Sequence, residues 1–302
     1  MNMKVDLCGV TLNNPVMTAS GTFGSGAEYS EFVDLNKLGA VVTKGVANVP
    51  WPGNPTPRVA EVYGGMLNAV GLQNPGIDVF CERDIPFLKK YDTKIIVNVC
   101  GHSTEEYIAV VERLRDQPVD LLEINISCPN VKEGGIAFGQ DPKAVEAITK
   151  EMKKYAAQPV IMKLSPNVTD ITEMARAAEA GGADGLSLIN TITGMKIDIH
   201  RRNFVLANRT GGMSGPAIHP VAVRMVYQTA QAVKLPIIGM GGIMNAEDAI
   251  EMILAGATAV SVGTANFANP KVTEQIVDGI RDYMEMYKVA DIKELIGAVH
   301  DR

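Results

Sequence analysis

The chain has 302 residues, of which 46% are hydrophobic, and a formal net charge of −6. These values are typical of a soluble globular protein with a large core, and the lack of a Lys/Arg block argues against a nucleic-acid-binding protein. No apolar run reaches the roughly 18 residues that a membrane span requires, and no signal peptide is visible, so we expect a cytoplasmic protein.

The first predicted element is a hairpin over residues 4–15, "KVDLCGVTLNNP", with its turn near Asn13–Asn14. Eight short β-branched runs follow it. Their continuous apolar character predicts strands that are buried on both faces, as in a parallel sheet. The predicted strands cover residues 15–20, 40–45, 94–99, 120–126, 159–165, 184–190, 236–241 and 259–264.

Helical patterns separate these strands. Residues 103–117 begin with a Ser/Thr cap, residues 169–182 open with Thr169 and end on glycine, and residues 245–256 begin at the cap Asn245. Eight strand–helix alternations in one chain predict a single (β/α)8 barrel domain over residues 1–302, with a doubly wound sheet as the alternative. We expect the hairpin to plug the N-terminal end of this barrel.

Two further segments stand apart from the alternation. Residues 46–77 are rich in Pro and Gly and are too long for an ordinary βα loop, so we predict a functional insertion there. Residues 270–299 predict the eighth helix and one additional helix.

Polar residues gather where the predicted strands end, which is where barrel enzymes carry their chemistry. Each one alone has a simpler explanation: a solvated lysine, an asparagine that satisfies loop backbone, or a cysteine that acts as a small buried apolar group. Together they predict a polar, anionic ligand, because burying two lysines and three asparagines without partners is costly. These strand-end residues are Ser20, Lys44, Asn98, Asn125, Ser127, Cys128, Lys163, Ser165, Asn190 and Thr191.

Glycines follow the last two predicted strands. Gly241 and Gly242 precede the helix that begins at Asn245, and Gly263 and Thr264 follow the eighth strand. Bare backbone N–H groups at such positions can approach a phosphate closely, and the loops after strands seven and eight are the common phosphate site of these barrels. Glycine is also ordinary at strand–helix turns.

The four cysteines are widely scattered: Cys8, Cys81, Cys100 and Cys128. None belongs to a C-x-x-C pair or to a Cys/His group with zinc spacing. The pattern predicts a reduced compartment, no disulfide framework, no metal site, and no iron–sulfur cluster within this chain.

Several motifs, in order along the chain, resemble class 1 dihydroorotate dehydrogenases. They are "GNPTPR" (53–58), "GMLNAVGLQNPG" (65–76), "NISCPN" (125–130), "KLSPN" (163–167), "NRTGGMSGPA" (208–217) and "GMGGI" (239–243). The resemblance covers roughly residues 4–268. "TPRVAE" and the "GMGG" ending of strand seven look like the NAD-linked class 1B branch rather than the fumarate-linked class 1A branch.

The resemblance implies an FMN-containing barrel that oxidises (S)-dihydroorotate to orotate in pyrimidine biosynthesis. It implies that Cys128 is the catalytic base, and that Lys163 lies by the N1/C2=O edge of the flavin. The implied cofactor-binding residues are Ser20, Lys44, Gly45, Asn98, Asn125, Lys163, Ile189, Gly215, Gly241, Gly242, Gly263 and Thr264. The implied substrate-binding residues are Lys44, Asn68, Ala69, Val70, Gly71, Leu72, Asn125, Asn190 and Thr191.

Class 1B membership further implies a partner subunit that carries FAD and a [2Fe–2S] cluster and passes electrons to NAD+. A homodimer core within a heterotetramer follows by analogy. This chain has no dinucleotide G-x-G-x-x-G motif after its first strand, which fits such a division of labour. Residues 130–139, "NVKEGGIAFG", have the paired glycines of a lid that closes over substrate, although a plain surface loop is the alternative.

Three other functions stay open at this point. A class 1A enzyme would share the cysteine and pass electrons to fumarate. A phosphate-binding barrel of the aldolase type would use Lys163 as a Schiff-base amine. A non-catalytic scaffold for a redox partner would bind flavin without oxidising dihydroorotate.

Overall fold

The computed structural model describes residues 1–127 and 139–300. Its centre is a closed barrel in which every neighbouring pair of strands is parallel, and the strands follow one another around the barrel in sequence order. Closure confirms the predicted (β/α)8 barrel and excludes the doubly wound sheet, which has open edges. The barrel strands are β3 (Val16–Thr18), β4 (Ala40–Val42), β7 (Lys94–Val99), β8 (Leu121–Asn125), β9 (Val160–Lys163), β10 (Gly185–Leu188), β15 (Ile237–Met240) and β16 (Ala259–Val262).

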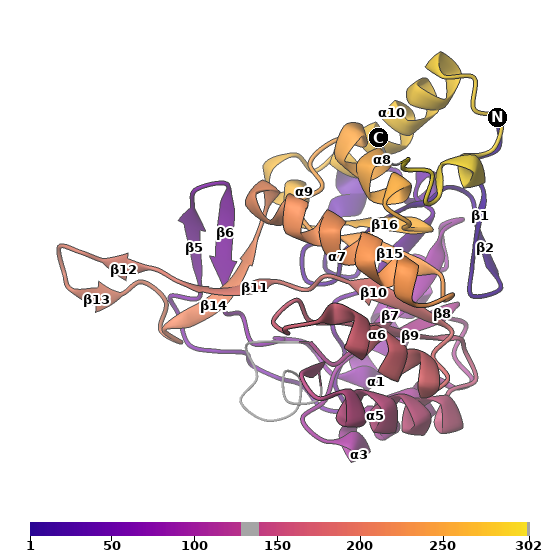
Figure 1. The fold of residues 1–302 in the computed structure, drawn as a ribbon. Coiled ribbons are helices and arrows are strands. Elements are labelled where there is room, and N and C mark those ends of the chain that lie inside the picture. Colours follow the sequence, from indigo (N-terminus) through magenta and orange to yellow (C-terminus); the bar gives the residue numbers. More distant parts are fainter. Residues whose placement is uncertain (128–138, 301–302) are drawn as a thin grey trace.

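Helices cover the outside of the barrel (Figure 1). In α3 (Thr104–Leu114), for example, Tyr107, Val110, Val111 and Leu114 are buried at helical spacing. The other α-helices are α1 (Ile77–Val79), α2 (Ile85–Leu88), α5 (Pro142–Tyr155), α6 (Ile171–Ala180), α7 (His219–Ala232), α8 (Ala246–Leu254), α9 (Ala265–Ala268) and α10 (Val272–Met286). The shorter helical turns are η1 (Tyr29–Glu31), η2 (Leu35–Lys37), η3 (Phe80–Asp84), η4 (Pro216–Ile218) and η5 (Ile292–Leu295).

Helix caps agree with the sequence at two of three sites. The Ser103 side chain accepts a hydrogen bond from the Glu106 backbone at the start of α3, and Asn245 does the same for Asp248 at the start of α8. The helix predicted to open with Thr169 begins instead at Ile171, with Asp170 as its cap. The additional helix predicted at the end of residues 270–299 is the short 3₁₀ turn η5.

The N-terminal hairpin consists of β1 (Val5–Leu7) and β2 (Val10–Leu12). Its turn lies at Cys8–Gly9, where both residues have positive φ, so the prediction of a turn near Asn13–Asn14 was wrong. Asn14 instead lies two residues before the first barrel strand, where its side chain accepts from Val16 N and donates to Lys37 O.

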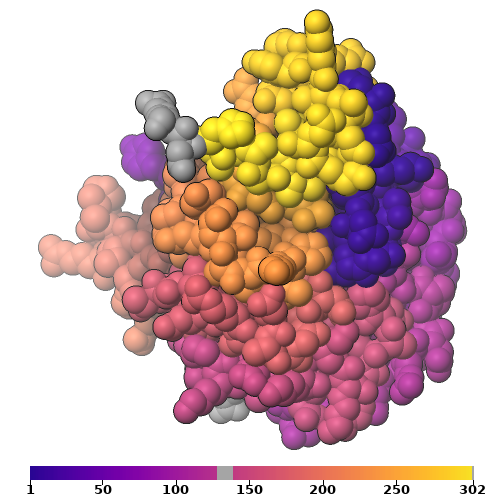
Figure 2. All heavy atoms as spheres, turned by 45° about the vertical axis from the view of Figure 1, so that its right-hand side comes forward, coloured from indigo at the N-terminus to yellow at the C-terminus, as the bar shows by residue number. Residues whose placement is uncertain are grey.

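The hairpin covers the N-terminal end of the barrel, as predicted. Leu7 and Leu12 have no exposed area. A Cβ on Gly185, the first residue of β10, would lie 2.7 Å from Cys8 Sγ, which places the hairpin turn directly against the start of a barrel strand. In Figure 2 this indigo segment lies against the yellow C-terminal segment, and the Asn2 side chain donates to Asp291.

A four-stranded antiparallel sheet stands at the opposite end of the barrel. It joins β5 (Val59–Val62) and β6 (Gly65–Asn68), from the predicted insertion at 46–77, to β11 (Ile192–Met195) and β14 (Thr210–Ser214), which follow barrel strand β10. A further pair, β12 (Ile197–Asp198) and β13 (Asn203–Phe204), projects away from the barrel (Figure 1). None of the strands β11–β14 was predicted. No helix in residues 1–127 and 139–300 is long and apolar enough to cross a membrane.

Candidate active site

A cavity lies at the C-terminal ends of the barrel strands, beside the four-stranded sheet. It holds about 1180 Å³ of empty space, a volume that includes the part open to solvent. Its wall takes residues from the ends of β3, β4, β8, β9, β10, β15 and β16 and from β6 and β14. Segments that are far apart in the sequence therefore meet around one space.

Most of the predicted site residues that the structure describes line this cavity. From the cofactor set these are Ser20, Lys44, Asn125, Lys163, Ile189, Gly215, Gly241, Gly242, Gly263 and Thr264. From the substrate set they are Lys44, Asn68, Val70, Gly71, Leu72, Asn125, Asn190 and Thr191. Cys128 and residues 130–138 of the predicted lid lie outside the described residues.

Three predicted site residues lie behind the cavity wall instead. Asn98 is fully buried and bonds to Glu123. Gly45 packs on Asn98, because a Cβ there would be 2.9 Å from Asn98 Oδ1. Ala69 is fully buried in a small apolar cluster with Leu67 and Leu206. These residues support the wall rather than line it.

The β8–β9 side of the cavity is a buried polar network. Asn125 Nδ2 donates to Asn98 Oδ1 at 3.4 Å, and Asn98 Nδ2 donates to Glu123 Oε2 at 2.5 Å. Lys163 Nζ lies 3.6 Å from the same carboxylate oxygen, and both side chains are at most 5% exposed. Paired residues on neighbouring parallel strands lie side by side. Asn98 of β7 is paired with Glu123 of β8, and Asn125 of β8 is paired with Lys163 of β9, so the four side chains meet.

The network continues to the residue that precedes Cys128. Ser127 is fully buried, and its hydroxyl donates to Asn125 Oδ1 at 3.0 Å. Asn190 Nδ2 donates to the Ser127 hydroxyl at 2.8 Å and to the Ser127 carbonyl at 3.2 Å. The Tyr107 hydroxyl donates to the Asn125 carbonyl at 2.7 Å. The end of β8 is thus fixed by side-chain hydrogen bonds from β10 and α3.

The β15–β16 side presents backbone rather than polar side chains. Gly241 and Gly242 have φ values of +130° and +68°, which favour glycine. A Cβ on Gly242 would lie 2.8 Å from both the Gly215 carbonyl and the His219 Cβ. A larger residue at position 242 would collide with these groups, so glycine is required there, and Gly215, Gly241 and Gly242 together form a glycine cradle at the cavity wall. The Thr264 hydroxyl donates to Ser214 Oγ at 2.6 Å across the cradle.

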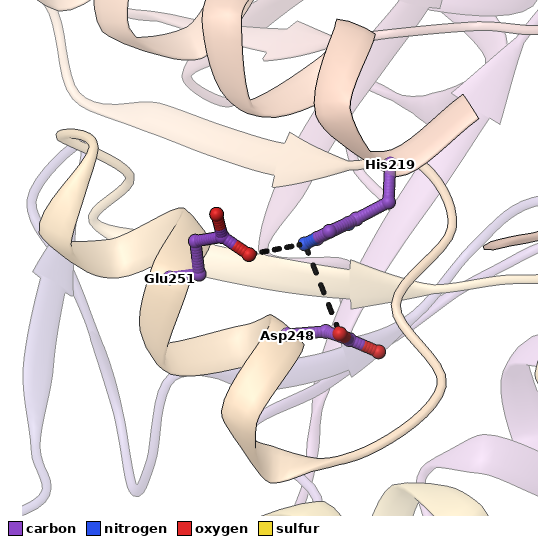
Figure 3. Close-up of side chains that lie close together, drawn as sticks. All are labelled: His219, Asp248 and Glu251. Atoms are coloured by element: carbon purple, nitrogen blue, oxygen red, sulfur yellow. Dashed lines mark hydrogen bonds and ion pairs between the residues drawn. The ribbon is translucent and has the colours of Figure 1, made fainter. Parts of the chain in front are cut away.

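His219 of α7 supports the glycine turn, and its ring faces Glu251 and Asp248 of α8 (Figure 3). Its Nδ1 lies 2.8 Å from the Gly241 carbonyl oxygen, which can only accept, so Nδ1 carries a proton and donates. Its Nε2 faces Glu251 at 3.2 Å and Asp248 at 4.0 Å. Although no metal ligands were predicted, these three side chains lie close enough to share an ion. In this structure the ring contacts the Gly241 carbonyl and these two carboxylates.

The cavity is electropositive. Among the described residues that line it, Lys44 and Lys163 are the charged ones, and none is acidic. Lys44 Nζ lies near the chain at Gly21, since a Cβ there would be 3.8 Å away. An anionic ligand is the natural occupant of such a space.

Sequence reasoning missed two supporting residues, Glu123 and His219. Glu123 stands inside the apolar run "DLLEINI", and a charged residue in a predicted buried strand was a usable signal. His219 had no such signal, because only the fold brings it to the glycine turn. The apolar wall residues Met66, Ile218 and Met240 were also missed.

Comparison with known proteins agrees with this geometry. Residues 2–284 match the family model described as dihydroorotate dehydrogenase. The chain is 71% identical to the "Dihydroorotate dehydrogenase B (NAD(+)), catalytic subunit" of Lachnoclostridium phytofermentans, over 99% of this chain and 100% of that protein. It is 66% identical to the protein of the same description from Alkaliphilus metalliredigens, over 99% of each.

A crystal structure of DHODH from Eimeria tenella, in complex with ferulenol, has the same fold, with a TM-score of 0.82 at 22% identity, covering 98% of this chain and 88% of that one. The family model and the two curated relatives confirm the resemblance that the sequence motifs indicated. The chain belongs to the dihydroorotate dehydrogenase family.

Proposed function

We propose that this chain oxidises (S)-dihydroorotate to orotate in pyrimidine biosynthesis, as the catalytic subunit of an NAD+-linked enzyme. The observation that carries the proposal is a single cavity at the barrel mouth that combines an amide and lysine floor with a glycine cradle. The names and the 66–71% identity of the relatives support the NAD-linked branch over the fumarate-linked one.

The cavity fits FMN as the cofactor. The cradle of Gly215, Gly241 and Gly242, with Gly263 and Thr264 beside it, suits a phosphate, because glycines leave the backbone of the cavity wall uncovered by side chains. Lys163, Asn125, Ser20 and the apolar side chain of Ile189 would hold a flat ring system. When bound, FMN supplies the acceptor for the hydride that dihydroorotate loses.

Amides and Lys44 would bind the substrate. Dihydroorotate carries a carboxylate and an imide-like edge, which asparagine side chains match as donors and acceptors. Asn68, Asn190 and Thr191 line the cavity together with Gly71 and Leu72. Asn190 is already held by Ser127, so its amide is oriented before substrate arrives.

Cys128 is the proposed base that removes the proton from C5 of the substrate. Its support is its place in the chain, directly after Ser127, which bonds to two amides of the cavity wall. Only the thiolate is basic, and a free thiol ionises near pH 8.5. Turnover is therefore expected to rise toward alkaline pH.

The electrons would leave this chain through a partner. The relatives are named catalytic subunits, which supports a second subunit. We propose that the partner carries FAD and a [2Fe–2S] cluster, passes electrons to NAD+, and joins a homodimer of this chain in a cytoplasmic heterotetramer.

Anaerobic addition of dihydroorotate to the isolated yellow protein tests the proposal. We expect the flavin absorption to bleach, and NAD+ alone not to restore it, because the partner is missing. Recovery on adding fumarate would favour the class 1A alternative. Bound flavin without bleaching would favour the scaffold, and a colourless protein with borohydride-trapped substrate on Lys163 would favour the aldolase type.

A further inference from the structure

Glu123 is a buried carboxylate directly behind the floor of the cavity. It lies in β8 two residues before Asn125, so both side chains point to the same side of the strand. Asn125 lines the cavity, whereas Glu123 is fully buried and does not. The residue occupies the layer beneath the floor.

The two oxygens of Glu123 have unequal surroundings. Oε2 accepts a hydrogen bond from Asn98 Nδ2 at 2.5 Å and lies 3.6 Å from Lys163 Nζ. Oε1 is buried and accepts no hydrogen bond from residues 1–127 or 139–300. Lys163 lines the cavity and is 4% exposed, so its ammonium stands between the carboxylate beneath and the ligand space above.

If Glu123 had only a structural role, its buried carboxylate would lower the free energy of unfolding. A buried carboxylate loses several kcal/mol of hydration, and an ion pair recovers it only when the remaining lone pairs are also satisfied. Glu123 Oε1 is not satisfied by the described protein groups. Without this carboxylate the buried Lys163 ammonium would lose its partner at 3.6 Å, so the negative charge of Glu123 serves Lys163.

We propose that Glu123 is a positioning residue for Lys163 and that it lowers the reduction potential of the bound flavin. This inference rests on the proposed function. Reduction adds electron density to a flavin, so a nearby ammonium favours the reduced form and raises the potential. Glu123 attracts the same ammonium downward and offsets its charge. A lower potential favours onward transfer of the electrons to the partner.

The decisive variant is Glu123→Gln, which keeps the side-chain shape and removes the charge. We expect it to raise the flavin midpoint potential, with the ratio of reduced-form to oxidised-form affinity rising about tenfold, equivalent to about 30 mV for a two-electron couple. Asp84→Asn is the matched control. It also removes one buried carboxylate, but Asp84 pairs with Arg83 and Ser25 and does not line the cavity. An unchanged potential in Glu123→Gln, or an equal shift in the control, would overturn the proposal.

A double-mutant cycle distinguishes an effect of Glu123 that acts through Lys163 from a direct electrostatic effect of Glu123 on the flavin. Lys163→Met alone should lower the potential. In that background Glu123→Gln should shift the potential less than in the wild type, because the ammonium is gone. Equal shifts in both backgrounds would contradict a role through Lys163.

Two further readouts keep the result interpretable. If Glu123→Gln does not fold, Glu123→Asp retains the charge but withdraws it from Lys163, and a smaller rise in potential is expected; no rise would count against the proposal. Flavin content and bleaching by dihydroorotate are measured on the wild type first. If the wild type has no flavin or is not bleached by dihydroorotate, the proposed function is refuted. If the wild type is bleached normally but the substitution of Glu123 does not change the flavin potential, only the role of Glu123 is refuted.

Discussion

The two ends of the barrel are built on opposite principles. At the N-terminal end an apolar hairpin closes the barrel with Leu7 and Leu12, and the thiol of Cys8 packs against the start of β10. At the C-terminal end the strands open into a cavity lined by lysines, amides and glycines. Substitutions at the N-terminal end should therefore change mainly the free energy of unfolding, whereas substitutions at the C-terminal end should change mainly turnover or ligand affinity.

The largest expected difference between the two ends is in the effect of removing the thiol of Cys128 or that of Cys8. We expect Cys128→Ala to lower kcat by about 10²- to 10⁴-fold, the usual contribution of a general base. Cys128→Ser should also slow turnover and move its controlling ionisation to higher pH. Stopped-flow flavin bleaching across pH measures both, with Cys8→Ala as the matched thiol control. Near-normal turnover with an unchanged pH profile in Cys128→Ala would remove the base from position 128.

The plug should affect stability without affecting chemistry. Leu7→Ala leaves a cavity in a fully buried site and is expected to cost about 2–5 kcal/mol of unfolding free energy. Its kcat at a temperature where it is folded should equal that of the wild type. Denaturant unfolding and turnover measure the two effects, and Thr11→Ala, on the exposed face of the same hairpin, is the control. A large loss of kcat in Leu7→Ala would show that the two ends are not independent.

The glycine cradle should show the reverse behaviour. Gly242→Ala places a Cβ 2.8 Å from the Gly215 carbonyl and from His219 Cβ, at a φ of +68°. Strain of this kind costs on the order of 1–3 kcal/mol, so the dissociation constant for FMN should rise about 5- to 150-fold. Gly182→Ala has a φ of +88° but meets nothing nearer than 3.9 Å, and it separates backbone strain from steric filling. Equal FMN affinity in the two variants would argue against the cradle.

The smallest expected effect is the pH dependence of the plug. Burial, together with the nearby carboxylates of Asp184 and Asp6, raises the pKa of the Cys8 thiol to about 12. The unfolded thiol ionises near pH 9, so between pH 9 and 12 the folded state holds a proton that the unfolded state releases. Stability should therefore fall as pH rises, by roughly 1 kcal/mol from pH 9 to 10. Cys8→Ser should lose this part of the slope in denaturant titrations.

The barrel was predictable because its strands are buried on both faces. The apolar runs at 94–99 and 120–126, for example, match β7 and β8 closely. The strands of the mouth sheet were not predictable in the same way. Thr210–Ser214 contains two consecutive glycines, and Ile192–Met195 is only partly buried, so neither has the composition of a core strand. β14 forms a strand by pairing with β6, a distant segment of the chain, and β11 then pairs with β14.

The site was predictable where strand ends carry polar residues, as at Lys163 and Asn190. It was not predictable where support comes from another element. Gly45 and Asn98 were expected in the ligand space, but sequence cannot show that a strand-end residue packs one layer behind the wall. His219 reaches the glycine turn from α7, 22 positions before Gly241 in the sequence.

The pairing of β6 with β14 links two parts of the cavity mechanically. β6 ends at Asn68, among the proposed substrate contacts, and β14 leads directly to Gly215 in the cradle. Asn68 Nδ2 also donates to Gly212 O at 3.4 Å. A ligand that shifts one strand must shift the other. The affinities for the two ligands are then thermodynamically coupled, and the coupling is reciprocal: each ligand changes the affinity for the other by the same factor.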